Sequence, residues 1–125
     1  MTANPLTRKA AGCHWEKAAE TFLRRNGLTT LSRNFRCRLG EIDLVMRDAS
    51  CLVFIEVRYR NHPHFGSGAD SIDTTKQRRI IRAADRYLQL HGGRVLPPCR
   101  FDVVSMKHLD GQLQVEWIRD AFCDE

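Results

Sequence analysis

Residues 41–60 read EIDLVMRDASCLVFIEVRYR, and this stretch decides the fold. Two runs rich in isoleucine, valine, leucine and phenylalanine, 41–46 and 52–60, flank the polar segment 47–51. Two apolar runs around a short polar connection are typical of a β-hairpin. The connection lacks the Asn-Gly or Asp-Gly pair of the tightest hairpin turns, so the prediction depends on the strands rather than on the turn.

Two acidic residues lie inside these predicted strands. If the turn is centred between Ala49 and Ser50, opposed residues have numbers that sum to 99, and Asp43 faces Glu56. Directly opposed side chains have Cβ atoms about 4.5–5.5 Å apart. The register therefore predicts two carboxylates nearly in contact, whereas a shift by one residue would place them on opposite faces of the sheet.

Strand alternation predicts which side chains share a face. One face of the first strand is expected to hold Glu41, Asp43 and Val45, and the other face Ile42, Leu44 and Met46. On the second strand Glu56 and Arg58 share a face, so Arg58 is expected across from Glu41.

The paired acids indicate a metal site. Two adjacent carboxylates repel each other unless one is protonated or a cation lies between them. Oxygen ligands from two carboxylates, completed by water, suit Mg²⁺ or Mn²⁺. The alternative is an ordinary ion pair between Glu41 and Arg58, with Asp43 and Glu56 on a solvated face of the sheet.

The rest of the chain predicts two helices and three further strands. Helical spacing of apolar residues indicates one helix over 14–26 and a second from Asp73 or Thr74 to about Leu90. The other strands are expected over 28–36, 100–106 and 113–118. This order, α-β-β-β-α-β-β, predicts an α/β fold with a small mixed β-sheet flanked by helices. We expect a loose N-terminus over 1–12, one domain over 13–120 and a tail over 121–125.

Composition favours a soluble globular domain. Of 125 residues, 42% are hydrophobic and 28% are charged, as in ordinary folded proteins. The longest uncharged apolar run, 52–55, is too short to cross a bilayer, and the first thirty residues lack a secretory signal. We therefore expect a cytoplasmic protein that does not bind membranes. Five cysteines without a C-x-x-C pair favour neither a zinc ribbon nor a redox motif.

Positive charge is concentrated in the middle of the chain. Sixteen arginines and four lysines against fifteen acids give a net charge of +5. Residues 24–60 hold eight basic and four acidic groups, and 73–94 hold six and two. Because the arginine fork matches phosphate oxygens, this excess predicts a polyanionic partner. A GC-rich genome would produce the same excess of arginine.

Several segments resemble the YraN-like family of small uncharacterised bacterial proteins. The segments that carry this resemblance are Asn34-Phe35-Arg36, 40–45, 53–60, Phe65-Gly66, 76–79 and 100–104. They occur in the family's order between about Gly12 and Lys107. That family is similar to archaeal Holliday-junction resolvases and to the restriction-endonuclease-like superfamily. The resemblance therefore implies a restriction-endonuclease-like core.

The same resemblance implies a catalytic site. In that superfamily an Asp on one strand and Glu-x-Lys on the next surround a metal that activates water against a DNA phosphodiester. Asp43 and Glu56 would then be metal ligands, the Val57 carbonyl a third, and Glu16 an acid that completes the site. Glu16 could equally face solvent. The implied protein is a Mg²⁺- or Mn²⁺-dependent endonuclease acting on DNA, including branched or structured DNA.

One position departs from the superfamily pattern. Arg58 stands where Lys is expected, and arginine stays protonated, so it can clamp phosphate oxygens but is a poor general base. Lys76 is the candidate substitute, and Gln77 could orient water or a phosphate; alternatively, both are ordinary first-turn helix residues. The competing hypothesis is a catalytically impaired nucleic-acid-binding or assembly module on the same fold.

Four arginines are the expected phosphate contacts, namely Arg60, Arg78, Arg79 and Arg82. The alternative for each is a solvated surface. His62 and His64 are predicted to be loop residues, and Trp15 and Trp117 to belong to the core. Apolar helix faces could also support a homodimer.

Overall fold

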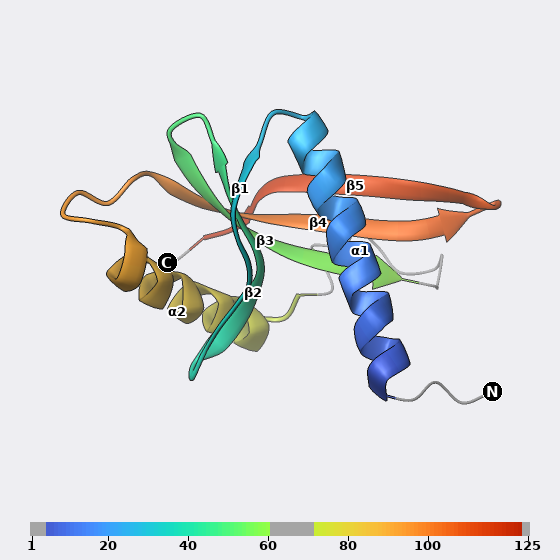
Figure 1. Cartoon of the computed structure of the whole chain (residues 1–125), viewed down its shortest axis with the longest axis horizontal. Helices are drawn as coiled ribbons and strands as arrows, with labels where there is room; N and C mark the ends of the chain where they lie inside the picture. The colour runs from blue at the N-terminus through green and yellow to red at the C-terminus, as the bar shows by residue number, and fades with distance from the viewer. Residues whose placement is uncertain (1–4, 61–71, 124–125) are drawn as a thin grey trace.

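Seven elements follow one another in the predicted order (Figure 1). The structure, a computed structural model, describes residues 5–60 and 72–123, and the side chains of the first helix from His14 onward. Its elements are α1 (Pro5–Arg25), β1 (Thr29–Cys37), β2 (Gly40–Asp48), β3 (Cys51–Arg60), α2 (Thr74–His91), β4 (Cys99–Leu109) and β5 (Gln112–Phe122). The α/β class predicted from the sequence is confirmed.

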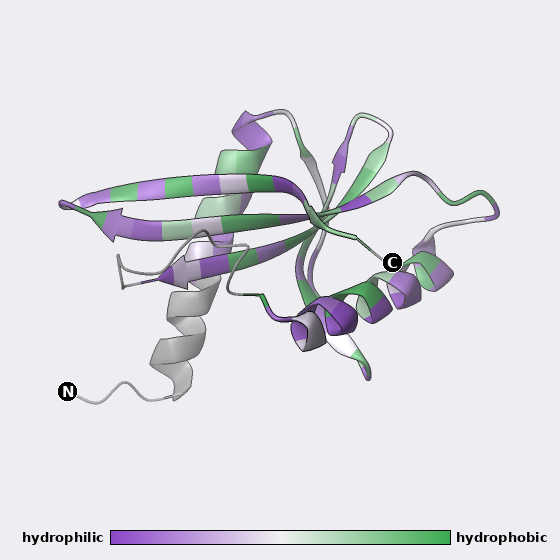
Figure 2. Ribbon diagram, turned by 180° about the vertical axis from the view of Figure 1, so that it is seen from behind, coloured by the Kyte–Doolittle hydropathy of each residue, from purple (hydrophilic) through white to green (hydrophobic). Residues whose placement is uncertain are grey.

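The five strands form one mixed sheet in the order β1-β2-β3-β4-β5. Strands β3 and β4 run parallel, whereas the other three neighbouring pairs are antiparallel. Parallel neighbours need a long crossover connection, and α2 lies within the one that joins β3 to β4. In Figure 2 green and purple segments alternate along β4 and β5, as expected where successive side chains point to opposite faces.

The predicted register of the central hairpin is confirmed. Strands β2 and β3 pair from Leu44 with Ile55 to Asp48 with Cys51, and each pair sums to 99. Ala49 and Ser50 are the two residues between the strands, where the sequence placed the turn.

Ala49 has φ of 54°, in the left-handed region that favours glycine. A Cβ atom in this conformation costs roughly 1–2 kcal/mol. Glycine relieves this strain in the folded state but also gives the unfolded chain more conformational entropy, which cancels part of the gain. We therefore expect Ala49→Gly to raise the free energy of unfolding by about 0.5–1 kcal/mol. Urea denaturation measures this, with Ser50→Gly, which lacks the positive φ, as the control expected to bring no gain. Equal effects of the two substitutions would contradict the prediction.

The two helices cover opposite faces of the sheet. From α1, Ala19 and Leu23 pack against a core that includes Val53 and Val104. From α2, Ile80, Ala83, Ala84 and Tyr87 pack against Val45 and Phe54 on the other face. Trp15 and Trp117 pack against the core on the α1 side, as the sequence indicates.

The predicted alternation along β2 is wrong at one point. Ile42 packs with Val45 on the α2 side, whereas Leu44 lies in the core on the α1 side. The strand bends here: its pairing with β3 ends at Leu44, and Asn34 on β1 has φ of 52°. The bend turns the free end of the β1–β2 hairpin toward α2, where the two lie side by side in Figure 1.

Two boundaries also differ from the expectation. Helix α1 begins at Pro5, so much of the segment predicted to be loose is helical. Proline suits a first helical position because its φ is already fixed near the helical value. At the other end β5 continues to Phe122, where it still pairs with Phe101, so two residues of the predicted tail belong to the sheet. Within residues 5–60 and 72–123, no helix is long and apolar enough to cross a membrane.

Candidate active site

The bend of β2 opens the sheet beside Asp43. One residue beyond the last β2–β3 pair, Asp43 Oδ2 accepts the backbone N–H of Val57 at 2.9 Å. The side chain thus replaces the backbone acceptor that a continued β2 would supply. The N–H and C=O of one strand residue point to the same side, so the Val57 carbonyl faces the same opening.

Glu56 faces this opening from the α2 side of β3. Its side chain is only 8% exposed, and its Oε1 atom forms an ion pair with Lys76 Nζ at 2.8 Å. Lys76 lies in the first turn of α2, where the N-cap residue Asp73 accepts the Lys76 backbone N–H at 2.8 Å. The helix cap that the sequence predicts therefore also sets the position of the lysine.

A third carboxylate reaches the site from the opposite face of the sheet. Glu16, half-buried on α1, hydrogen-bonds to the side chains of Asp43 and Asn34. The left-handed backbone of Asn34 is tolerated because asparagine adopts it more readily than most residues. Four residues that the sequence proposed, Glu16, Asp43, Glu56 and Lys76, are thus brought together from α1, β2, β3 and α2.

Burial and neighbouring charges strongly perturb Asp43. Burial, followed by the negative charges of Glu56 and Glu16, raises the pKa of Asp43 to about 8, although the Val57 N–H and Lys76 oppose the shift. Burial is also the main cause that raises the pKa of Glu16. The cluster therefore holds more negative charge than Lys76 alone can balance. A carboxyl with a strongly raised pKa beside other charged groups is typical of functional sites.

The donor set fits a divalent cation in part. In the side chains described from residue 14 onward, no three His, Cys, Asp or Glu groups converge closely enough to hold a metal by themselves. Mg²⁺, however, is commonly held by one or two carboxylates and several waters. Asp43 and Glu56 fit that arrangement, with the Val57 carbonyl facing the same opening. Oxygen ligands alone exclude a thiolate-type zinc site.

The other predicted site residues that the structure describes lie on β3 and α2. Arg58 follows Glu56 by two residues, on the same strand face, and Arg60 ends the strand. Gln77 donates its amide N–H to the Ile72 carbonyl at 3.0 Å, which fixes the start of α2. Arg78 and Arg82 are exposed elsewhere on α2. The histidines His62 and His64 lie outside the described residues.

A cavity of about 750 Å³ adjoins the cluster. It lies between the connection of β1 to β2 and the first turns of α2, and Glu56 and Lys76 form part of its wall. Three arginines also line it, namely Arg36, Arg38 and Arg79. The sequence predicted only Arg79. The other two lie at the end of β1 and in the β1–β2 turn, and were not singled out from the sequence.

Two more buried carboxylates hold the fold together. Glu20 on α1 accepts Arg33 Nε at 2.8 Å and Thr30 Oγ1 at 2.6 Å, which ties α1 to β1. The hydrogen bond from Arg33 lowers the pKa of Glu20. The other is Asp102 on β4, which is fully buried.

Fold and site together define a small mixed α/β protein with a carboxylate cluster at a break in its sheet. The model of the uncharacterised protein family UPF0102 matches residues 15–106, and the chain belongs to this family. This confirms the YraN-like resemblance. A UPF0102 protein of Nitrosococcus oceani is 49% identical over 118 residues, which cover 94% of this chain and 95% of the relative. One from Methylobacillus flagellatus is 45% identical over 91% of this chain and 97% of its own length.

Proposed function

We propose that this protein is a Mg²⁺- or Mn²⁺-dependent nuclease that hydrolyses phosphodiester bonds in DNA, with branched or structured DNA among its substrates. The observation that supports this most is the proximity of Asp43 and the buried Glu56 beside an opened strand. Burial, followed by the charges of Glu56 and Glu16, raises the pKa of Asp43 to about 8 and so lowers stability at neutral pH; a divalent cation would relieve the repulsion between the carboxylates. Asp43, Glu56 and the Val57 carbonyl are the proposed ligands.

Arg58 and Lys76 would respectively bind the phosphate and transfer protons. A bound divalent ion would supply acidified water and neutralise charge on the phosphate. Arg58 would clamp phosphate oxygens through its guanidinium fork, because arginine is always charged. Lys76, whose Nζ lies 2.8 Å from Glu56, is the residue beside the carboxylates that can exchange a proton with water. Lys76 would thereby take over the role of the strand lysine that this chain lacks.

Metal binding tests the proposal directly. We expect calorimetric titration with Mg²⁺ and Mn²⁺ to show binding to the wild-type protein, weakened by more than about tenfold in Asp43→Asn and Glu56→Gln. With labelled linear, flap and four-way-junction DNA, cleavage should require the metal and slow by roughly 100-fold or more in the same variants. Asp110→Asn removes an exposed carboxylate at the β4–β5 turn, outside the cluster and the residues that line the cavity, and should change neither result. Absent metal binding together with intact DNA across the panel would overturn the proposal.

A second candidate function follows from Arg58. The same fold could be a DNA-binding or assembly module whose chemistry is impaired, because no lysine stands two residues after Glu56. Arg58→Lys separates the two functions. An increase in cleavage would show that Arg58 limits an otherwise competent site. Salt-sensitive DNA binding that persists in EDTA, with no cleavage by wild type or Arg58→Lys, would favour the binding module.

A further inference from the structure

We infer that the cavity between the β1–β2 connection and α2 binds a phosphodiester backbone, with Arg36, Arg38 and Arg79 contacting successive phosphates. This cavity is called the arginine groove below. The inference rests on the proposed function, because the groove leads to Glu56 and Lys76. The arginine groove would bind the nucleic acid, whereas Asp43 and Glu56 would bind the metal.

The groove is preformed by a close contact of backbones. A Cβ atom on Gly40 would lie 2.6 Å from the backbone oxygen of Arg79, so only glycine permits this approach. The contact fixes the end of the β1–β2 hairpin against α2. Arg79 follows Lys76 by three residues, so the two side chains are neighbours on the helix surface. The arginines and the acid cluster are therefore held in one rigid frame.

The acidic residues that line the groove already have partners, which leaves Arg38 and Arg79 available to bind phosphate. Glu41 pairs with Arg36 at 3.3 Å, and both side chains are largely exposed. Glu56 pairs with Lys76, and Asp73 is occupied as the helix cap. Among the described side chains, neither Arg38 nor Arg79 forms an ion pair. Because the exposed Arg36–Glu41 pair is weak, an incoming phosphate can also compete for Arg36.

The chemistry favours a nucleic acid over an acidic peptide. Guanidinium groups match the two oxygens of a phosphate, and a phosphodiester chain repeats that group at every nucleotide. The groove also offers an apolar contact, since Leu39 lines it and is 51% exposed. A backbone of alternating phosphate and sugar, with bases beside it, can use both the charged and the apolar surface.

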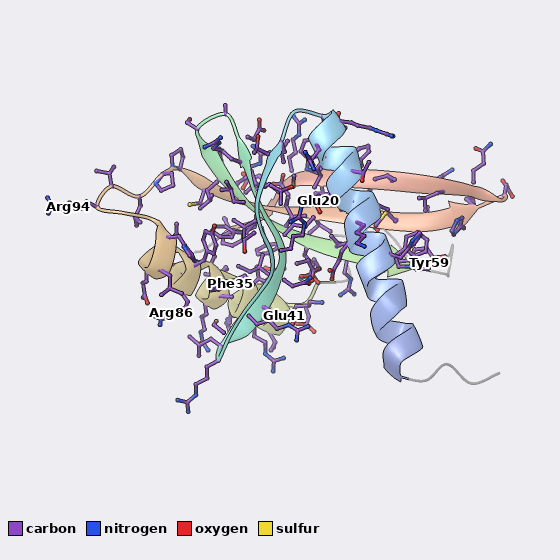
Figure 3. All side chains as sticks on the ribbon, in the orientation of Figure 1. Glu20, Phe35, Glu41, Tyr59, Arg86 and Arg94 are labelled. Atoms are coloured by element: carbon purple, nitrogen blue, oxygen red, sulfur yellow. The ribbon has the colours of Figure 1, made fainter. Side chains whose placement is uncertain are left out.

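Binding in the absence of metal tests the inference. We expect fluorescence anisotropy in EDTA to show salt-sensitive binding of short DNA and RNA strands by the full chain. Arg38→Ala and Arg79→Ala should each lower the slope of log affinity against log salt by about 1. Leu39→Ser should weaken binding with the slope unchanged, because it removes no charge. The matched control is Arg94→Ala: Figure 3 places this exposed arginine beyond the far end of α2, away from Glu41.

Each outcome of these measurements either supports or overturns the inference. Loss confined to the groove variants supports the inference, whereas an equal loss in Arg94→Ala, or no binding at low salt, overturns it. Competition by polyglutamate as effective as that by DNA would assign the groove to acidic peptides instead. The same anisotropy measurement with single-stranded DNA, duplex DNA and RNA identifies which nucleic acid binds most tightly. Calorimetry separates this inference from the proposed function, because the groove variants should still bind Mn²⁺ and Asp43→Asn should still bind DNA in EDTA.

Discussion

Replacing Asp102 with asparagine is expected to lower the free energy of unfolding by about 3–5 kcal/mol. The carboxylate is fully buried and accepts hydrogen bonds from three donors. These are Arg100 Nε, whose single N–H is shared between the two carboxylate oxygens at 3.0 and 3.1 Å, Trp117 Nε1 at 2.9 Å and the Asp120 N–H at 2.9 Å. An asparagine amide would turn two donor hydrogens toward these donors. It would also leave the Arg100 charge with Asp48 as its remaining partner.

This network joins β2, β4 and β5, so its loss should affect the whole sheet. Urea denaturation followed by far-ultraviolet circular dichroism measures the change. Asp110→Asn is the matched control, because Asp110 is exposed at the β4–β5 turn with φ of 52°, a conformation that asparagine tolerates. The control should change stability by less than about 0.5 kcal/mol. A loss below 1 kcal/mol in Asp102→Asn would show that the buried network contributes little.

Replacing Asp43 with asparagine is expected to have the opposite effect on stability. The folded state raises the pKa of this carboxyl from an ordinary value near 4 to about 8. Between these two pH values the folded protein keeps a proton that the unfolded chain has lost, so wild-type stability falls as pH rises. Asparagine has no charge to bury beside Glu16, Glu56 and Lys76. In EDTA, Asp43→Asn should therefore be more stable than wild type by about 1–3 kcal/mol at pH 9.

The difference should shrink as the pH falls toward 4, where the carboxyl stays protonated in the folded state and the unfolded chain begins to regain its proton. Denaturation at constant ionic strength from pH 4 to pH 9 measures it. Glu41→Gln, which removes an exposed carboxylate from the same strand, should show no comparable dependence on pH. Equal stability of Asp43→Asn and wild type at pH 9 would contradict the burial argument. A carboxylate retained despite such a stability loss is expected where function requires it.

These two strand aspartates, Asp102 fully buried and Asp43 half-buried, have opposite environments. Asp102 is surrounded by donors, so its charge is compensated and stabilises the fold. Asp43 receives one backbone N–H and faces two other carboxylates, so its charge is opposed. The sequence places both in apolar strands and singles out Asp43 only through its register with Glu56; it does not show how either charge is compensated. Their different roles follow from the neighbours that the tertiary structure supplies.

Local patterns were sufficient for most of the architecture. Two apolar runs around the polar segment 47–51 located the hairpin, and a turn centred between Ala49 and Ser50 gave the β2–β3 register. The capping residue Asp73 and the helical spacing of Ile80 and Tyr87 likewise predicted α2 to within one residue at its end. Signals of this kind depend on near neighbours in the chain, which is why they can be read from sequence alone.

The sequence by itself therefore determined the order of elements, the register of the β2–β3 hairpin that brings Asp43 near Glu56, and the position of Lys76 at the start of α2. Only the tertiary structure decided that β2 bends away at Asp43, that Ile42 changes face, and that Arg36 and Arg38 reach α2. These features depend on a left-handed residue, Asn34, and on the contact of Gly40 with Arg79. Contacts between residues so distant in the chain arise from packing, which no local periodicity encodes.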